Sequence, residues 1–98
     1  MSEKIQLKHP EGKHAVKIEK DKYDVMSKAI LTCLKPGELT HKGMLVEVHS
    51  YFKKNKIKFS GSVEWYMELV KLDLEANKKV ERVTEDSKLK FRLAAKGI

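Results

Sequence analysis

The sequence predicts an α+β fold in which two short strands precede three helices and a β-hairpin closes the chain. In three separate segments, apolar residues recur every three to four positions, which is typical of helices with one core-facing side. Near both ends of the chain they alternate with polar residues instead, which is typical of strands. Turn-forming pairs such as Pro36-Gly37 and Ser60-Gly61 separate the helical segments.

Residues 1–20 are expected to hold the strand pair, because polar and apolar side chains alternate in 4–8 and again in 15–19. The segment between them, residues 9–12, contains a proline and a glycine at positions that suit a turn. Asp21 is expected to open the first helix, about 22–34, and Asp24 lies three positions later in the manner of a capping box.

The second helix is expected to run from a Thr40 N-cap to about Asn55. Its last turn and the following loop contain four lysines, and cations there stabilise the negative end of the helix dipole. These lysines therefore also have a purely structural explanation; they are Lys53, Lys54, Lys56 and Lys58.

The third helix, Ser62–Asn77, contains the only tryptophan and has the strongest pattern in the chain. Ser62 is expected to be its N-cap. Four apolar residues at i, i+4, i+7 and i+11 are expected to face the core, and Trp65 is assigned to the core rather than to an interface; they are Trp65, Leu69, Leu72 and Ala76. Four residues with the same spacing are expected to face solvent: Glu64, Glu68, Lys71 and Glu75.

The last element is expected to be a hairpin with a strand at 79–84, a tip at Asp86-Ser87, and a second strand that turns Leu89, Phe91 and Leu93 inward. Val80 and Val83 fall on opposite faces of the first strand, which suggests either a bulge or a strand boundary other than the one predicted. Three helices followed by a hairpin is the winged-helix arrangement, a variant of the helix-turn-helix. The chain is thus expected to be one winged-helix domain over 1–98, with strands in 1–20, helices in 21–77 and the wing at 79–93.

The chain resembles a small bacterial family of uncharacterised proteins of roughly 100 residues. The most specific part of the likeness is the LDLEA run within Val70–Ala76, followed by Glu81-Arg82. Further resembling residues are His9-Pro10, Tyr23, Ala29-Ile30-Leu31, Leu39-Thr40, Phe59-Ser60-Gly61 and Trp65-Tyr66. A glycine is common in the family where this chain has Lys78, so Asn77 is expected to supply the left-handed helix end. The resemblance implies a winged-helix-like fold and no assigned activity.

Charge, hydropathy and cysteine content limit the classes of function that the sequence allows. The chain of 98 residues has a net charge of +7, but the third helix holds four acidic residues and one lysine. No apolar run approaches the ~20 residues of a membrane span, and no signal peptide is recognisable, so a membrane partner is not expected. A single cysteine fits a reducing cytoplasm.

Two functional hypotheses remain open. The basic excess and the topology favour nucleic-acid binding through phosphate contacts, for which the predicted residues are Lys71, Lys79, Arg82, Lys88, Lys90 and Arg92. The acidic side of the third helix argues against this, because it would face phosphates. The alternative is a protein-interaction module with no nucleic-acid role, in which an acidic helix and a basic hairpin could pair two copies as a homodimer. Its predicted surface residues are Glu64, Tyr66, Glu68 and Glu75. Tyr66 suits either the core or an interface.

Catalysis is not expected, nor is a cofactor, a metal or a small-molecule substrate. The four histidines lack metal-ligand spacing, and Cys33 is expected to be a buried, inert thiol. Asp73 lies between two leucines, and a partly buried carboxylate needs a partner. We expect a contact between Asp73 and Arg82, the alternative being an amide in the turn of the first strand.

Overall fold

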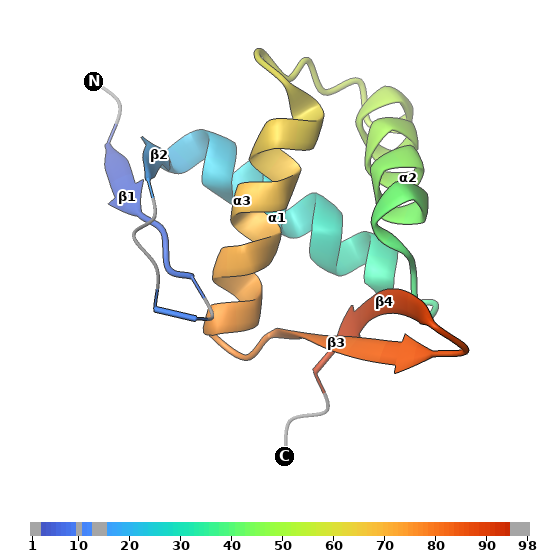
Figure 1. The fold of residues 1–98 in the computed structure, drawn as a ribbon. Helices are drawn as coiled ribbons and strands as arrows, with labels where there is room; N and C mark the ends of the chain where they lie inside the picture. Colours follow the sequence, from blue (N-terminus) through green and yellow to red (C-terminus); the bar gives the residue numbers. More distant parts are fainter. Residues whose placement is uncertain (1–2, 10, 13–15, 95–98) are drawn as a thin grey trace.

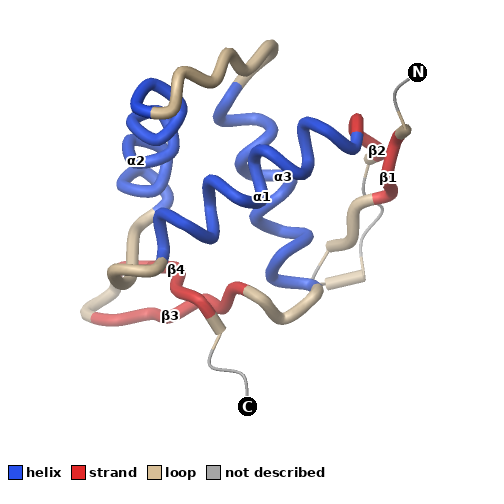
Figure 2. The backbone as a smooth tube through the Cα atoms, turned by 180° about the vertical axis from the view of Figure 1, so that it is seen from behind, coloured by secondary structure: helices blue, strands red, loops and turns tan. Residues whose placement is uncertain are grey.

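The computed structural model describes residues 3–9, 11–12 and 16–94. Within them the fold is α+β, with three helices and two antiparallel two-stranded hairpins. The elements are β1 (Lys4–Gln6), β2 (Lys17–Glu19), α1 (Lys20–Leu34), α2 (His41–Lys54), α3 (Val63–Ala76), β3 (Val80–Glu85) and β4 (Lys88–Leu93). Figure 1 shows α3 crossing in front of α1, with β1 and β2 beside the start of α1 and the β3–β4 hairpin near its end. Figure 2 shows the same crossing from behind.

The start of α1 differs from the prediction. Glu19 is the N-cap and makes no side-chain capping bond, so the predicted capping box of Asp21 and Asp24 is wrong. The backbone explains this, because Lys20 N–H donates to the Glu3 carbonyl of the neighbouring strand at 2.7 Å. Asp24 instead pairs with Lys20 one turn away, at 2.9 Å.

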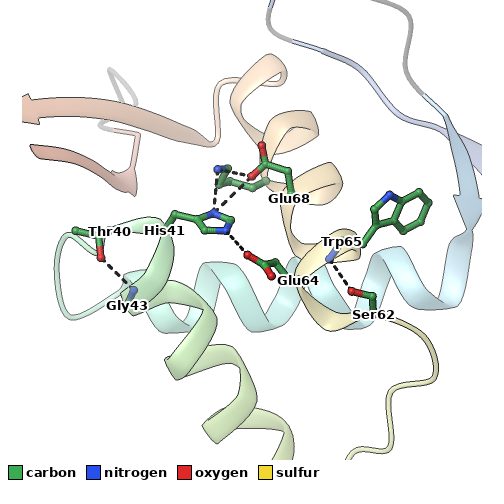
Figure 3. Close-up of polar contacts among 8 residues, drawn as sticks. Thr40, His41, Gly43, Ser62, Glu64, Trp65 and Glu68 are labelled. Carbon is green, nitrogen blue, oxygen red and sulfur yellow. Dashed lines mark hydrogen bonds and ion pairs between the residues drawn. The ribbon is translucent and has the colours of Figure 1, made fainter.

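The N-caps of the other two helices are confirmed. The Thr40 hydroxyl accepts from the Gly43 N–H at 3.0 Å, and the Ser62 hydroxyl accepts from the Trp65 N–H at 3.2 Å (Figure 3).

The end of α3 differs from the expectation that Asn77 supplies the left-handed residue. Lys78 itself has φ +61°, whereas Asn77 has φ −90°. Lys78 N–H donates to the Glu75 carbonyl at 3.0 Å and Lys79 N–H to the Leu74 carbonyl at 2.8 Å, which is a Schellman motif. A glycine there would adopt this conformation without the Cβ penalty.

The core lies between the three helices and is closed by the hairpins. Its members are Leu7, Ile18, Met26, Ala29, Ile30, Leu34, Met44, Val48, Phe52, Met67, Val70, Leu74, Val80 and Phe91. Phe91 also joins the hairpin to the segment between α1 and α2. Its N–H and carbonyl bond the carbonyl and N–H of Leu39, at 2.7 and 3.0 Å.

The two N-terminal strands are shorter than predicted, and the C-terminal hairpin is more regular. β1 and β2 span three residues each, and residue 15 of the predicted second strand lies outside the described residues. The predicted bulge is wrong, because β3 and β4 pair in unbroken register from Val80↔Leu93 to Glu85↔Lys88. The tip at Asp86-Ser87 is confirmed, and both residues have positive φ, as in a type I′ turn.

Two of the three predicted inward positions on β4 need correction. Phe91 is buried as expected, but Leu93 is half-buried and Leu89 is 43% exposed. Leu89 pairs with Thr84 next to the hairpin tip, whereas Phe91 pairs with Arg82 further from the tip. Alternation gave the correct face of the strand, but it could not tell how far along the strand the core continues.

Several residues of α3 that were predicted to face the core are accessible, and two that were predicted to face solvent are buried. Trp65 is 50% exposed, so its assignment to the core is wrong, and Leu69, Leu72 and Ala76 are only half-buried. The core-facing side consists of Met67, Val70 and Leu74. On the predicted solvent side, Glu64 and Glu68 are accessible, but the side chains of Lys71 and Glu75 are only 4% and 6% exposed.

Asp73 anchors the N-terminal segment to α3. Its carboxylate accepts from Lys8 N–H at 2.8 Å, Tyr23 O–H at 2.7 Å and the Asn77 side-chain amide at 3.2 Å. The predicted contact with Arg82 is therefore wrong and the backbone-amide alternative is correct. Burial, together with the hydrogen bond to Asp73, raises the pKa of Tyr23 far above its usual range.

Candidate functional site

A groove of about 630 Å³ lies between α3, the start of α2 and the β3–β4 hairpin. Its volume is in the range of ligand-binding clefts. Its lining mixes exposed apolar side chains, carboxylates and two cations from elements far apart in sequence. The lining residues are His41, Ser62, Glu64, Trp65, Glu68, Lys71, Arg82, Leu89 and Phe91.

Lys71 forms part of the groove floor. Its Nζ lies 4.1 Å from the centroid of the Phe91 ring and 2.7 Å from Glu68 Oε1. A lysine this buried needs both a counter-charge and a polarisable neighbour, and the carboxylate and the ring supply them. The Lys71 ammonium is therefore committed to internal contacts.

His41 connects α2 to the acidic side of α3. It is the first residue of α2, directly after the Thr40 cap, and its Nε2 lies 3.3 Å from Glu64 Oε2. Its Nδ1 lies 3.5 Å from Glu68 Oε1 and 3.4 Å from Lys71 Nζ (Figure 3). The imidazole thus lies between two carboxylates, and these contacts become ion pairs when it is protonated.

Two carboxylates form the accessible acidic rim of the groove. The side chains of Glu64 and Glu68 are 63% and 45% exposed. Each uses one oxygen in the contacts above, and within the described residues the other oxygen has no hydrogen-bond partner. The rim can therefore accept hydrogen bonds from a cationic group of a ligand.

The cations of the hairpin are mostly neutralised by neighbouring glutamates. Arg82 bonds Glu75, and this bond raises the pKa of its guanidinium. Arg92 bonds Glu81 and lies 3.5 Å from Glu38, and Lys90 lies 3.8 Å from Glu85. These pairs leave the hairpin less basic than its sequence suggests.

The predicted nucleic-acid contacts therefore do not form one basic surface. Lys71 is buried and Arg82, Lys90 and Arg92 are paired with carboxylates. Lys79 and Lys88 are exposed, the first beside the end of α3 and the second at the hairpin tip. Only Lys71 and Arg82 of this set line the groove. Whether any of the six residues contacts nucleic acid stays a prediction.

The predicted interaction residues are also divided. Glu64 and Glu68 lie together on the groove rim, whereas the Glu75 side chain is buried against Arg82. Tyr66 is half-buried on another side of α3, where its hydroxyl lies 3.3 Å from Lys22 Nζ and its ring packs against Phe59. The Tyr66 ring also contacts the exposed Trp65 ring edge-on, with the two ring centroids 4.9 Å apart.

Trp65 marks the outward direction of α3. Figure 3 shows its ring pointing to the other side of the helix from His41, with Glu64 and Glu68 between them. The half-buried Leu72 lies two turns further along the same side, at i+7. Together, Glu64, Trp65, Glu68 and Leu72 form an accessible strip, which we call the outer face of α3.

Sequence reasoning missed His41 and Leu89. The only signal for His41 was its place after an N-cap, and its partner Glu64 is 23 residues away in sequence. Leu89 was assigned to the core by alternation alone. Both join the site through the packing of the hairpin and α2 around α3, which no local pattern encodes.

The remaining reactive groups lie elsewhere or are dispersed. Cys33 is half-buried rather than fully buried, and burial, aided by Glu47, raises the pKa of its thiol. Among residues 3–9, 11–12 and 16–94, no group of three His, Cys, Asp or Glu side chains is placed to hold a metal ion. The part of the chain that the structure describes also contains no helix with the length and apolarity to cross a membrane.

Residues 4–91 match a family described as Family of unknown function (DUF6958). The chain belongs to this family. The match agrees with the resemblance to a small uncharacterised family, while a bacterial source stays a prediction. No curated protein and no solved structure matches the chain significantly.

Proposed function

We propose that this DUF6958 protein is a protein-interaction domain of winged-helix type that binds a partner polypeptide with the groove and the outer face of α3. The order of three helices and a hairpin supports the winged-helix assignment. The bridge between Leu39 and Phe91 supports it further, because it ties the hairpin to the segment between α1 and α2.

The observation that carries the proposal is the exposure of Trp65 and Leu89 on the rim of one groove. Large apolar side chains at a hollow surface mark interaction sites more often than isolated ones do. Tryptophan is also the residue most enriched among those that dominate binding energy. Glu64 and Glu68 lie among these apolar groups and can provide orientation and selectivity.

The same surface is poorly suited to the nucleic-acid role. In helix-turn-helix proteins the recognition helix lies against the DNA, and α3 holds that place in the proposed fold. Its accessible charges are two carboxylates, which phosphates repel, and its central group is an indole. A polypeptide with apolar and cationic side chains matches this surface better.

Selection from a random peptide library tests the proposal directly. We expect displayed peptides that bind the wild-type domain and lose most binding to Trp65→Ala. Val46→Ala is the matched control, because Val46 is an exposed apolar residue on α2 that does not line the groove. Failure to enrich any peptide, or enrichment of peptides equally sensitive to both variants, would contradict the proposal.

Nucleic-acid binding is the second candidate, and one observation favours it. Lys53, Lys54, Lys56 and Lys58 are all exposed around the end of α2. Fluorescence anisotropy with a random-sequence duplex at about 50 and 200 mM salt tests it, because phosphate contacts weaken steeply with salt. Binding that requires these lysines would place nucleic acid away from the groove, and no binding at the lower salt would remove this candidate.

A further inference from the structure

We propose that the partner segment is an amphipathic helix whose apolar stripe is flanked by arginine or lysine, and that it docks along α3. The inference rests on the proposed protein-binding function and specifies its ligand. Three independent features of the surface support it: the spacing of the outward apolar residues, the charge beside them, and the opposing hairpin wall.

Four apolar residues on the side of α3 that carries Trp65 have the spacing of a helix–helix seam, and one of them, Leu69, also packs against the core. Trp65, Leu69, Leu72 and Ala76 are separated by four, three and four residues, as in the alternating seam of helices that pack lengthwise. Trp65 and Leu72 are the accessible members of the seam that lie outside the main core packing. The 14 residues of α3 span about 21 Å, which matches a partner helix of about four turns.

The charge beside this seam is negative. Glu68 lies directly before Leu69, and Glu64 lies one turn before Glu68 on the groove side. The cations nearest to them are unavailable to compensate a ligand's acids, because Lys71 is buried and Arg82 is bonded to Glu75. Flanking charges decide partner choice in lengthwise helix packing, so this surface favours a basic flank and disfavours an acidic one.

The hairpin provides a second wall. Leu89 is 43% exposed and lines the same groove as Trp65, across from α3. Of the four seam residues, Trp65 lines the groove. A helix that docks along the seam can therefore contact the Leu89 wall at its Trp65 end, in the manner of helix-in-groove recognition. The half-exposed Trp65 ring, held by its edge contact with Tyr66, is a rigid anchor at the rim.

Three labelled 18-residue peptides test the inference by fluorescence anisotropy. The first carries leucines in a 4-3-4 spacing flanked by arginines, the second has glutamates in place of the arginines, and the third is a scramble of the first. We expect the first peptide to bind at least about tenfold more tightly than the other two. Trp65→Ala should weaken its binding about tenfold or more, as expected for an anchoring aromatic residue.

A charge reversal sharpens the test. Glu64→Lys should weaken binding of the arginine peptide and strengthen binding of the glutamate peptide, because Glu64 is highly exposed and, within the described part of the chain, its side chain bonds His41 alone. Glu47→Lys, on an exposed position of α2 outside the groove, is the control and should change neither. Circular dichroism confirms that each variant remains folded.

The possible outcomes distinguish failure of the inference from failure of the proposed protein-binding function. Equal binding of the arginine peptide and its scramble would mean simple charge attraction and would overturn the inference. Trp65-dependent library peptides without an amphipathic basic pattern would overturn the inference but keep the proposed function. A Trp65-dependent dimer in sedimentation experiments would identify a second copy as the occupant and overturn it as well. If neither the designed peptides nor the library bind, both proposals fall.

Discussion

The two apolar faces of α3 look alike in sequence and behave differently in the structure. One face, Met67, Val70 and Leu74, is fully enclosed by α1, α2 and the hairpin. The other, led by Trp65 and Leu72, is accessible and lies outside the main core packing. A helix with apolar residues on most sides is usually enclosed on most sides, and the accessible face is the one that we propose binds a partner. The comparison shows that periodicity finds the faces of a helix, whereas the neighbouring elements decide which face is buried.

The largest expected effect on stability comes from comparing two leucines of α3, one on each face. Leu74→Ala should lower the free energy of unfolding by about 2–5 kcal/mol, because it leaves a cavity in the core. Leu72→Ala should cost about 1 kcal/mol or less, since Leu72 keeps part of its surface in water. Urea denaturation measures both. Equal losses would mean that the two faces are buried to the same degree, and the comparison would fail.

Asp73 provides the second test, because it is the polar anchor of the enclosed part of α3. Asp73→Asn replaces one carboxylate oxygen with an NH2 group that donates and cannot accept, so at least one of the three hydrogen bonds is lost and we expect a loss of about 1–3 kcal/mol in the free energy of unfolding. Glu64→Gln on the outer face should stay within about 0.5 kcal/mol. A loss below about 0.5 kcal/mol for Asp73→Asn would mean that the carboxylate is merely solvated.

The same anchor predicts a pH dependence. The pKa of Tyr23 is raised in the folded protein, so its neutral form is favoured there, and this contribution is complete below the ordinary value of 10.0. As pH rises above about 10, the unfolded tyrosine ionises first and the free energy of unfolding falls. Tyr23→Phe should show a shallower fall in urea midpoints between pH 9 and 11. An identical slope in both proteins would contradict the assignment.

A small effect on stability is also expected for the side chain of Trp65. Trp65→Ala should change the free energy of unfolding by about 1 kcal/mol or less, because half of the side chain is already in water. Thermal unfolding, with Val46→Ala as the exposed control, measures it. A loss approaching that of Leu74→Ala would show that the tryptophan supports the core, and the outer face would lose its functional interpretation.

The sequence was a good guide to local structure and a poor guide to its assembly. Element order, the Thr40 and Ser62 caps, and the hairpin tip follow from local chemistry and were predicted. The burial of Lys71 and the exposure of Trp65 were not, because both depend on where the hairpin and α2 pack against α3.

The candidate site was predictable only in part for the same reason. Glu64 and Glu68 were recognised as an acidic surface, since they share one side of a helix. Their meeting with His41 and Leu89 joins three elements across the fold, and the pairing of hairpin cations with Glu38 and Glu81 depends on tertiary packing and strand register. The net charge of the sequence therefore predicted a more extensive basic surface than the structure has.

Acrylamide quenching of tryptophan fluorescence tests the central claim most directly, because Trp65 is the only tryptophan in the chain. In the free protein at low concentration we predict ready quenching, as expected of an indole that is half exposed. Saturation with a library-selected peptide should shield Trp65 and lower its quenching constant severalfold. A tryptophan that is already shielded in the free protein, or equally quenched with every bound peptide, would contradict the claim that the outer face of α3 is a binding surface.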